Sequence, residues 1–237
     1  MLSLNNKTVF ITGATRGIGL SIAETFSNSG AKVIGTGTKP VYKSNLDDYF
    51  QTDFTDLQQI MSCVDFLKKI KPDILINNAG INKNAPFLDI KPEVFLQIQQ
   101  VNVFAPFLLC QAAISGMREK KWGRIVNISS IWGKISKEQR AAYSASKFAL
   151  DGVTISLAAE FAKEGILANC VAPGFTDTEL TKEMLGPKGI EVILKTVPIG
   201  RMAKVEEIAA LVLWLSSNEN QYITGQNISI DGGFTRV

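Results

Sequence analysis

Tyr143 and Lys147 stand four residues apart in the stretch YSASK. If this stretch is helical, the two side chains lie one turn apart on the same face. A cation held there would favour the tyrosinate and lower a phenol pKa that is normally about 10. The tyrosine would then be a usable proton donor near neutral pH. Because this spacing also arises by chance, the hypothesis needs support from the rest of the chain.

A glycine-rich loop supplies the first support. TGATRGIG, residues 12–19, follows a strand-like run and opens a segment with helical spacing. Gly13 permits a tight turn, Gly17 lets the backbone approach a ligand, and Gly19 allows the helix to pack closely on a sheet. The helix N-terminus offers free N–H groups and a positive dipole end to a phosphate. The loop therefore predicts a nucleotide-binding role.

Composition excludes several other classes of function. The net charge of +3 and the lack of a long basic run argue against nucleic acid. There is no histidine and no CxxC, and the three cysteines are far apart, so we expect no metal site and reduced, buried thiols. The N-terminus leads directly into a strand-like run, and no apolar run approaches the ~18 residues of a membrane span. We expect a soluble, cytoplasmic protein.

Short apolar runs alternate with helical segments along the whole chain, which predicts the fold. The expected strands are 8–12, 31–36, 49–53, 73–77, 124–129, 167–172 and 227–230, and the expected helices are 17–29, 56–69, 92–119, 141–163 and 205–216. Several runs are continuously apolar, as in parallel strands buried on both faces. The pattern predicts a single-domain α/β Rossmann fold, with a doubly wound parallel sheet of about seven strands and helices on both faces.

We find no linker, repeat or low-complexity stretch, so we expect one NAD(P)-binding domain over residues 1–237. The least regular segment is 173–200, which follows the end of a predicted strand and carries proline, glycine and charge. Ligands of open α/β sheets lie beyond the carboxyl ends of the strands. This position predicts a substrate lid within residues 174–200.

Five motifs occur in an order that resembles the short-chain dehydrogenase/reductase family. They are the Gly-x-x-x-Gly-x-Gly loop, NNAG at 77–80, YSASK at 143–147, PGF at 173–175 and YITGQNISIDGG at 222–233. The resemblance covers nearly the whole chain, and the ordered series is far more specific than any single motif. It implies an oxidoreductase that uses a nicotinamide cofactor.

The resemblance assigns roles to four positions. Tyr143 would protonate a carbonyl oxygen as hydride arrives, and Lys147 would lower the tyrosine pKa and hold the nicotinamide ribose. Ser130, thirteen positions before Tyr143, would donate to the same oxygen. Ser129 is the competing candidate, but the family spacing selects Ser130. Asn102, in QVNVF, resembles the helix-embedded asparagine that supports a water relay to the lysine.

The second strand bears on which nicotinamide cofactor is bound. NAD binders place an acid after it, whereas Gly37 occupies that position here, followed by Thr38 and Lys39. Arg16 could make charge-assisted hydrogen bonds to a 2′-phosphate. NADP(H) is therefore preferred over NAD(H). The expected cofactor contacts, with Asp53 and Phe54 resembling the adenine-contacting pair, are Gly13, Thr15, Arg16, Gly17, Ile18, Gly19, Thr38, Asp53, Phe54, Asn78, Ala79, Gly80, Tyr143, Lys147, Pro173, Gly174, Thr176 and Thr178.

The subgroup that the chain most resembles is the bacterial 3-oxoacyl-(acyl-carrier-protein) reductases, through TGATRGIG, AKVIGT, VAPGF and VPIGRM. This resemblance implies an NADPH-dependent ketoreductase acting on a 3-oxoacyl thioester in fatty acid biosynthesis. The apolar helices 92–119 and 141–163 would pair across a two-fold axis in a homotetramer.

Two departures leave the substrate and the partner open. NAG continues as INKNAPF rather than with a Thr-Arg-Asp stretch, which reads more like relatives acting on sugars, polyols or small ketones. Glu164 stands where those reductases place arginine for the acidic acyl carrier protein, although Lys120 and Lys121 keep part of a basic patch. A catalytically silent NADP-binding regulator is the remaining alternative. The expected pocket lining is Asn82, Trp132, Gln139 and Phe175.

Overall fold

The computed structural model describes residues 2–40 and 46–237. Within this part, one sheet of seven strands has the order β3-β2-β1-β4-β5-β6-β7, and every neighbouring pair is parallel. The strands are β1 (Thr8–Ile11), β2 (Lys32–Gly37), β3 (Asp48–Gln51), β4 (Ile74–Asn77), β5 (Gly123–Ile128), β6 (Ile166–Pro173) and β7 (Asn227–Ile230). The predicted fold class and all seven strands are confirmed. The expected domain 1–237 includes residues 1 and 41–45, which lie outside the described part.

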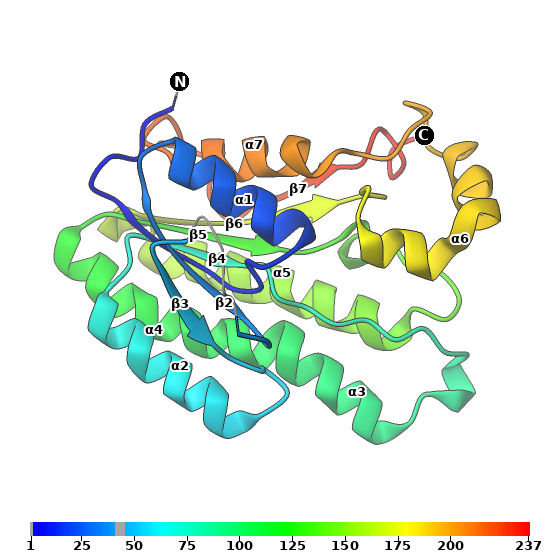
Figure 1. Cartoon of the computed structure of the whole chain (residues 1–237), viewed down its shortest axis with the longest axis horizontal. Coiled ribbons are helices and arrows are strands. Elements are labelled where there is room, and N and C mark those ends of the chain that lie inside the picture. Colours follow the sequence, from blue (N-terminus) through cyan, green and yellow to red (C-terminus); the bar gives the residue numbers. More distant parts are fainter. Residues whose placement is uncertain (1, 41–45) are drawn as a thin grey trace.

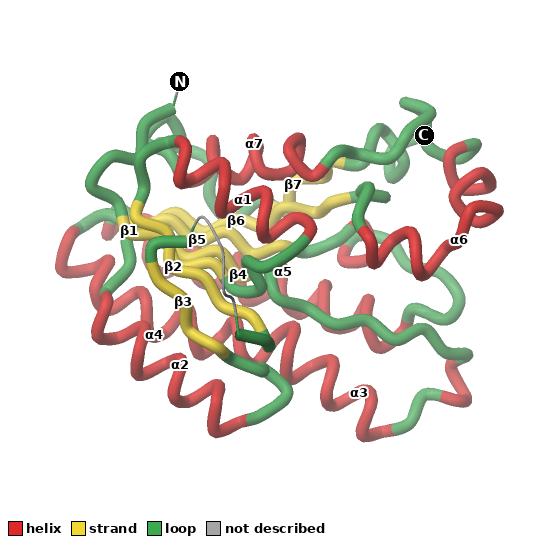
Figure 2. The backbone as a smooth tube through the Cα atoms, viewed as in Figure 1, coloured by secondary structure: helices red, strands yellow, loops and turns green. Residues whose placement is uncertain are grey.

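Helices cover both faces of the sheet. Above it in Figure 1 lie α1 (Gly17–Asn28) and α7 (Val205–Ser216), and below it lie α2 (Leu57–Ile70), α3 (Pro92–Gln99), α4 (Ala105–Lys120) and α5 (Ala141–Phe161). Figure 2 shows the strands as one stack between these two helical layers. The two layers bury separate apolar clusters, one centred on Phe26, Ile76 and Val212 and the other on Phe10, Leu109 and Met117. The continuously apolar strands contribute side chains to both clusters, because β4 and β6 are buried at every residue.

The predicted helix 92–119 is interrupted. Residues Gln100–Phe104 form a π-helical turn between α3 and α4, and Asn102 lies within it. Such turns insert one extra residue into a helix and recur at functional sites. The stretch Pro92–Lys120 is long and apolar enough to cross a membrane by length and composition alone, but 61% of its most apolar window is buried inside the protein. A core helix passes the same test, so this stretch is weak evidence for a membrane span.

The lid segment is more regular than the sequence suggests. Residues Glu179–Leu194 form α6, which is bent at Gly186, where φ is +60°, and is followed there by Pro187. The expectation of an irregular 173–200 was therefore wrong over this range. The sequence pattern did not predict this helix because it contains Gly186 and Pro187, and both residue types disfavour a helix interior. No residue of α6 is buried, and the helix stands at one end of the molecule (Figure 1).

Candidate active site

A cavity of about 400 Å³ opens at the carboxyl ends of the strands. This is within the range of small-molecule sites. Every residue predicted to bind cofactor lines it, together with Ser130. Among the four residues with predicted catalytic roles, only Asn102 does not line it. Residues that sequence reasoning did not include are also part of the wall, namely Thr36, Thr52, Thr55, Ile81, Val101, Ile128, Glu179, Leu180 and Thr181.

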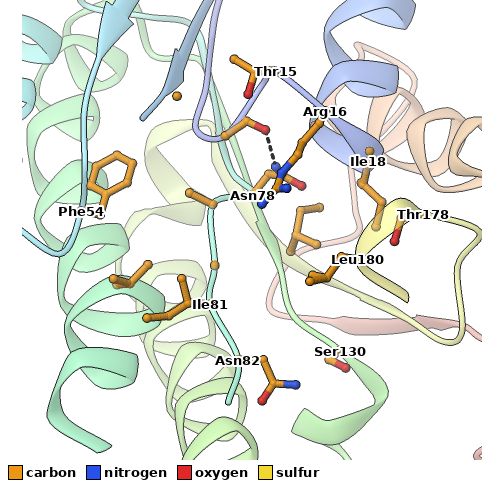
Figure 3. A pocket seen from close by; sticks show the side chains of 18 of the residues that line it. Thr15, Arg16, Ile18, Phe54, Asn78, Ile81, Asn82, Ser130, Thr178 and Leu180 are labelled. Carbon is orange, nitrogen blue, oxygen red and sulfur yellow. Dashed lines mark hydrogen bonds between the residues drawn. The ribbon is translucent and has the colours of Figure 1, made fainter. Parts of the chain in front are cut away.

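The glycine loop forms the upper end of the cavity (Figure 3). Gly13 and Gly17 adopt φ values of +67° and +55°, which side-chain-bearing residues rarely reach. A Cβ at Gly19 would stand 2.1 Å from the carbonyl oxygen of Gly13. The first turn of α1 contains no acidic residue and receives no side-chain cap. A dinucleotide pyrophosphate fits this loop, because the N–H groups of the first turn of α1 have no acceptor within the helix and can bind an anion.

Asn78 holds the loop in place. Its amide nitrogen donates to the carbonyl oxygens of Thr12 and Gly13, each at 3.0 Å, and Figure 3 shows this link. The Thr12 hydroxyl accepts from the backbone N–H groups of Asn78 and Ala79 at 3.0 and 2.9 Å. The NNAG motif therefore ties the end of β4 to the loop after β1. This structural role accompanies its place in the cavity wall.

The end of β2 has no room for an acid. A Cβ at Gly37 would stand 2.7 Å from Thr15 Cγ2 and 2.8 Å from Tyr49 Oη. Thr38 and Arg16 line the cavity beside it, and both are exposed. A 2′-phosphate would meet a cation and a hydroxyl here, so the wall fits NADP(H) better than NAD(H).

Ser130 and Tyr143 meet at the opposite end of the cavity from the glycine loop. Ser130 stands two residues after the end of β5, and Tyr143 belongs to the first turn of α5. The Ser130 hydroxyl accepts the Trp132 backbone N–H at 3.2 Å, and its interaction with the phenol acts to lower the pKa of Tyr143. Ser129 instead donates to the backbone oxygen of Lys147 at 3.4 Å. This geometry favours Ser130 over Ser129 as the group that faces a reacting oxygen.

Lys147 is anchored by the sheet. Its ammonium donates to the carbonyl oxygen of Ile128 at 2.8 Å and is buried. Burial lowers the pKa of Lys147 to about 8. Its nitrogen lies 5.6 Å from the ring centre of Tyr143. The expected pair therefore shares one site.

The electrostatics of Tyr143 differ from the expectation. Burial raises the pKa of Tyr143, and the groups that act against this rise are Ser130, by a hydrogen bond, and Arg140, by its charge. Lys147 was expected to supply the lowering. It is not among the causes, because its ammonium is directed to Ile128 and is itself hard to charge in this buried position.

Asn102 lies behind the cavity wall. Its side chain exchanges two hydrogen bonds of 2.9 Å with the backbone of Ile81 and donates to Ser146 Oγ at 3.0 Å. A Cβ at Gly80 would stand 3.3 Å from Asn102 Oδ1 and 3.6 Å from Lys147 Nζ. Asn102 thus sits next to the lysine, separated from the cavity by the Gly80 backbone.

The expected substrate lining divides into two groups. Asn82 lines the cavity near Ser130 (Figure 3), and its Oδ1 is buried without a hydrogen-bond partner. Trp132 and Phe175 form an edge-on aromatic pair with centroids 6.4 Å apart, outside the cavity wall. Gln139 is also outside it, with φ at +65°. Arg140, whose charge acts to lower the pKa of Tyr143, was not selected from the sequence.

Comparison with known proteins adds a family match. A family model described as Enoyl-(Acyl carrier protein) reductase matches residues 13–235. The 3-oxoacyl-(acyl-carrier-protein) reductase FabG of Salmonella typhimurium is 37% identical, with 100% of each chain covered.

Solved structures agree with the fold. A protein from Beutenbergia cavernae, provisionally named an NAD(P)-dependent gluconate 5-dehydrogenase and containing NADP at low occupancy, has a TM-score of 0.94 at 30% identity, with 99% of each chain covered. A 3-oxoacyl (acyl-carrier-protein) reductase from Agrobacterium tumefaciens with NADP bound has a TM-score of 0.90 at 30% identity, covering 97% of this chain and 95% of that one.

Proposed function

The chain belongs to the short-chain dehydrogenase/reductase family, and from that premise we propose that it is an NADPH-dependent ketoreductase that converts a carbonyl into a secondary alcohol. The observation that carries the proposal is the meeting of Ser130, Tyr143 and Lys147 in the same cavity as the glycine loop. When bound, the reduced nicotinamide supplies hydride. The residues of the chain must orient the carbonyl and deliver a proton.

The proton comes from Tyr143 in this proposal. Its phenol is half-buried and lines the cavity together with Ser130, so both hydroxyls can point at one carbonyl oxygen. Donors fixed in advance stabilise the charge that develops on that oxygen, since they need no reorganisation during the reaction. Lys147 lies behind the tyrosine, and Asn102 lies beside the lysine. This arrangement suits Lys147 and Asn102 to return a proton to Tyr143 after the reaction.

The proposed cofactor is NADP(H), with NAD(H) bound more weakly. Arg16 and Thr38 offer a cation and a hydroxyl at the end of β2, where Gly37 excludes an acid. The NADP-bound structures from Beutenbergia cavernae and Agrobacterium tumefaciens support the same choice.

A 3-oxoacyl thioester is the first candidate substrate, because the FabG relative is 37% identical over its whole length. A small keto acid, keto-sugar or polyol is the second. Neutralised charges favour this second class, since Glu164 pairs with Arg118 at 2.6 Å and Lys120 pairs with Asp73 at 2.8 Å. At Arg118 and Lys120 an acidic carrier protein would therefore meet cations that are already engaged.

We further propose a cytoplasmic homotetramer built on α4 and α5. Phe107, Phe148 and Ile155 on these helices are 40%, 47% and 50% exposed, and burying them against a second copy would be favourable. Light scattering coupled to gel filtration measures the oligomeric state. A monomer at micromolar concentration would contradict this part of the proposal.

The experiment for the reaction is a screen of NADPH oxidation across acetoacetyl thioesters, keto acids, keto-sugars and small diketones, with NADH alongside. We expect turnover with at least one class and faster turnover with NADPH than with NADH. A protein that binds NADPH but oxidises it with none of these carbonyls would be the silent regulator instead.

A further inference from the structure

Asn82 lines the cavity, and the protein leaves its side-chain amide unused. Within the described part of the chain, its Oδ1 is enclosed without a hydrogen-bond partner and its Nδ2 donates to no group. The other amides near this wall are engaged, since Asn78 holds the glycine loop and Asn102 holds the backbone of Ile81. An enclosed polar atom without a partner is costly, so the free amide of Asn82 needs a reason.

The backbone that carries Asn82 is fixed on both sides. On one side, the Asn102 amide exchanges two hydrogen bonds of 2.9 Å with the backbone of Ile81. On the other side, the Ala85 N–H donates to the carbonyl oxygen of Gln139 at 3.3 Å. Because the chain is held at both points, the place of the Asn82 side chain in the cavity wall is set before a ligand arrives, as a binding residue requires. The amide itself can still turn about its terminal bond to meet that ligand.

Asn82 lies at the end of the cavity where the carbonyl would react. Figure 3 shows Asn82 and Ser130 together at the end away from the glycine loop, with the amide directed to the side of Ser130 in that view. Two residues before Asn82, a Cβ at Gly80 would stand 3.6 Å from Lys147 Nζ. Tyr143 lines the same cavity. A substrate whose carbonyl oxygen meets Ser130 and Tyr143 therefore brings the groups beside its carbonyl to Asn82.

We infer that Asn82 is a specificity-determining residue that hydrogen-bonds a hydroxyl group beside the substrate carbonyl, so that the preferred substrate is a hydroxyketone of the keto-sugar class. This inference rests on the proposed reductase function and selects within it. An amide offers both a donor and an acceptor, and a hydroxyl group does the same, so a hydroxyl can bond either atom of the amide. A carboxylate only accepts, and the carbon atoms that flank the ketone of a 3-oxoacyl thioester carry no hydrogen-bond donor.

The test compares small ketones that differ in one group beside the carbonyl. Hydroxyacetone carries a hydroxyl there, methoxyacetone is its methyl ether, and butanone has a methyl group in place of the hydroxyl. Methoxyacetone withdraws electrons from the carbonyl much as hydroxyacetone does, so it separates recognition of the O–H group from intrinsic reactivity. Erythrulose represents a keto-sugar, and acetoacetyl-pantetheine represents a 3-oxoacyl thioester. In wild type we expect kcat/KM for hydroxyacetone to exceed that for methoxyacetone by about 10-fold or more.

Asn82→Leu removes both hydrogen-bonding groups at similar size. For hydroxyacetone and erythrulose we expect kcat/KM to fall about 10- to 100-fold in this variant, because the substrate hydroxyl is left without its partner. For butanone kcat/KM should change by less than about threefold. Asn82→Asp keeps an acceptor oxygen at the same place, so it should recover part of the hydroxyacetone activity.

Asn84→Leu is the matched control, because Asn84 lies in the same segment but is exposed and outside the cavity wall. It should leave the ratio of hydroxyacetone to butanone activity unchanged. NADPH affinity, measured by fluorescence, shows whether each variant is folded. If Asn82→Leu leaves that ratio unchanged, or if wild type prefers acetoacetyl-pantetheine to every hydroxyketone, the inference is overturned while the reductase function stands. If wild type reduces no carbonyl, the proposed function itself fails.

Discussion

The ammonium of Lys147 lies 5.6 Å from the ring centre of Tyr143, but its hydrogen bond goes to the carbonyl oxygen of Ile128 at 2.8 Å. The lysine is therefore fixed by β5 and not by the tyrosine. Ser130 and Arg140 act to lower the pKa of the phenol, against the effect of burial. A bound ribose hydroxyl would give the lysine a second acceptor, which suits the family role of holding the nicotinamide ribose.

Burial of Lys147 predicts a pH-dependent cost to stability. Its pKa falls from 10.5 to about 8 in the folded chain, so between these values the unfolded state binds more protons. The free energy of unfolding contributed by this residue therefore rises with pH from about 8 to 10.5. Lys147→Met removes this pH-dependent contribution to the free energy of unfolding, so the stability difference between variant and wild type should change across this pH window.

Urea unfolding at several pH values measures that difference. Lys163→Met, at an exposed position just after α5, is the control for the loss of a lysine from this region. A pH-independent difference for Lys147→Met would contradict the burial of a titrating ammonium. Activity of Lys147→Met should fall by about 100-fold or more at every pH.

Cofactor choice should depend on Arg16. In Arg16→Ala, NADPH affinity should fall about 10- to 100-fold, since a charge-assisted hydrogen bond to the 2′-phosphate is lost. NADH affinity should stay the same, because NADH lacks that phosphate. Fluorescence titration with both cofactors measures this, with Lys32→Ala at the start of β2 as the control for a general loss of positive charge. Equal losses of affinity for NADPH and NADH would show that Arg16 does not bind the 2′-phosphate.

Close packing at Gly19 should make it intolerant of a side chain. In Gly19→Ala the new Cβ would stand 2.1 Å from the Gly13 carbonyl oxygen and 2.4 Å from Asn78 Nδ2. The loop must shift, so we expect a loss of about 1–3 kcal/mol in stability and of NADPH binding. Gly189→Ala is the control, because this glycine lies in α6, away from the proposed interface on α4 and α5, and its added Cβ would approach only side-chain atoms of Leu185, the nearer at 3.3 Å.

Thermal unfolding separates the two variants. Gly189→Ala should change stability by less than about 1 kcal/mol, with NADPH binding unchanged. If Gly19→Ala bound NADPH as tightly as wild type, the loop would not be the close-packed cradle described here.

The sequence predicts the centre of the sheet well because β4, β5 and β6 are buried at every residue, and β4 in particular appears as an apolar run. The motif residues then follow, since the carboxyl ends of parallel strands meet at one edge. Helix α6 was missed because Gly186 and Pro187 interrupt its pattern and no apolar face is buried. The π-helical turn at Asn102 was missed because one extra residue barely changes the spacing of apolar side chains.

Arg140 was missed for a different reason. In the sequence it is one charged residue in SKEQRAAY, next to Lys137 and Glu138, and such runs usually face solvent. Only tertiary packing against Trp132 buries it. Long-range contacts of this kind leave no local pattern in a single chain.

The most direct test of the account is the rate of NADPH oxidation by wild type and Tyr143→Phe on the best substrate of the carbonyl screen. We predict that the substitution lowers kcat about 1,000-fold and changes NADPH affinity by much less, because the proton donor is removed while the ring stays in the cavity wall. Tyr222→Phe, at a side chain that is 97% exposed, should match wild type. Full activity in Tyr143→Phe would contradict the proposal that this phenol delivers the proton.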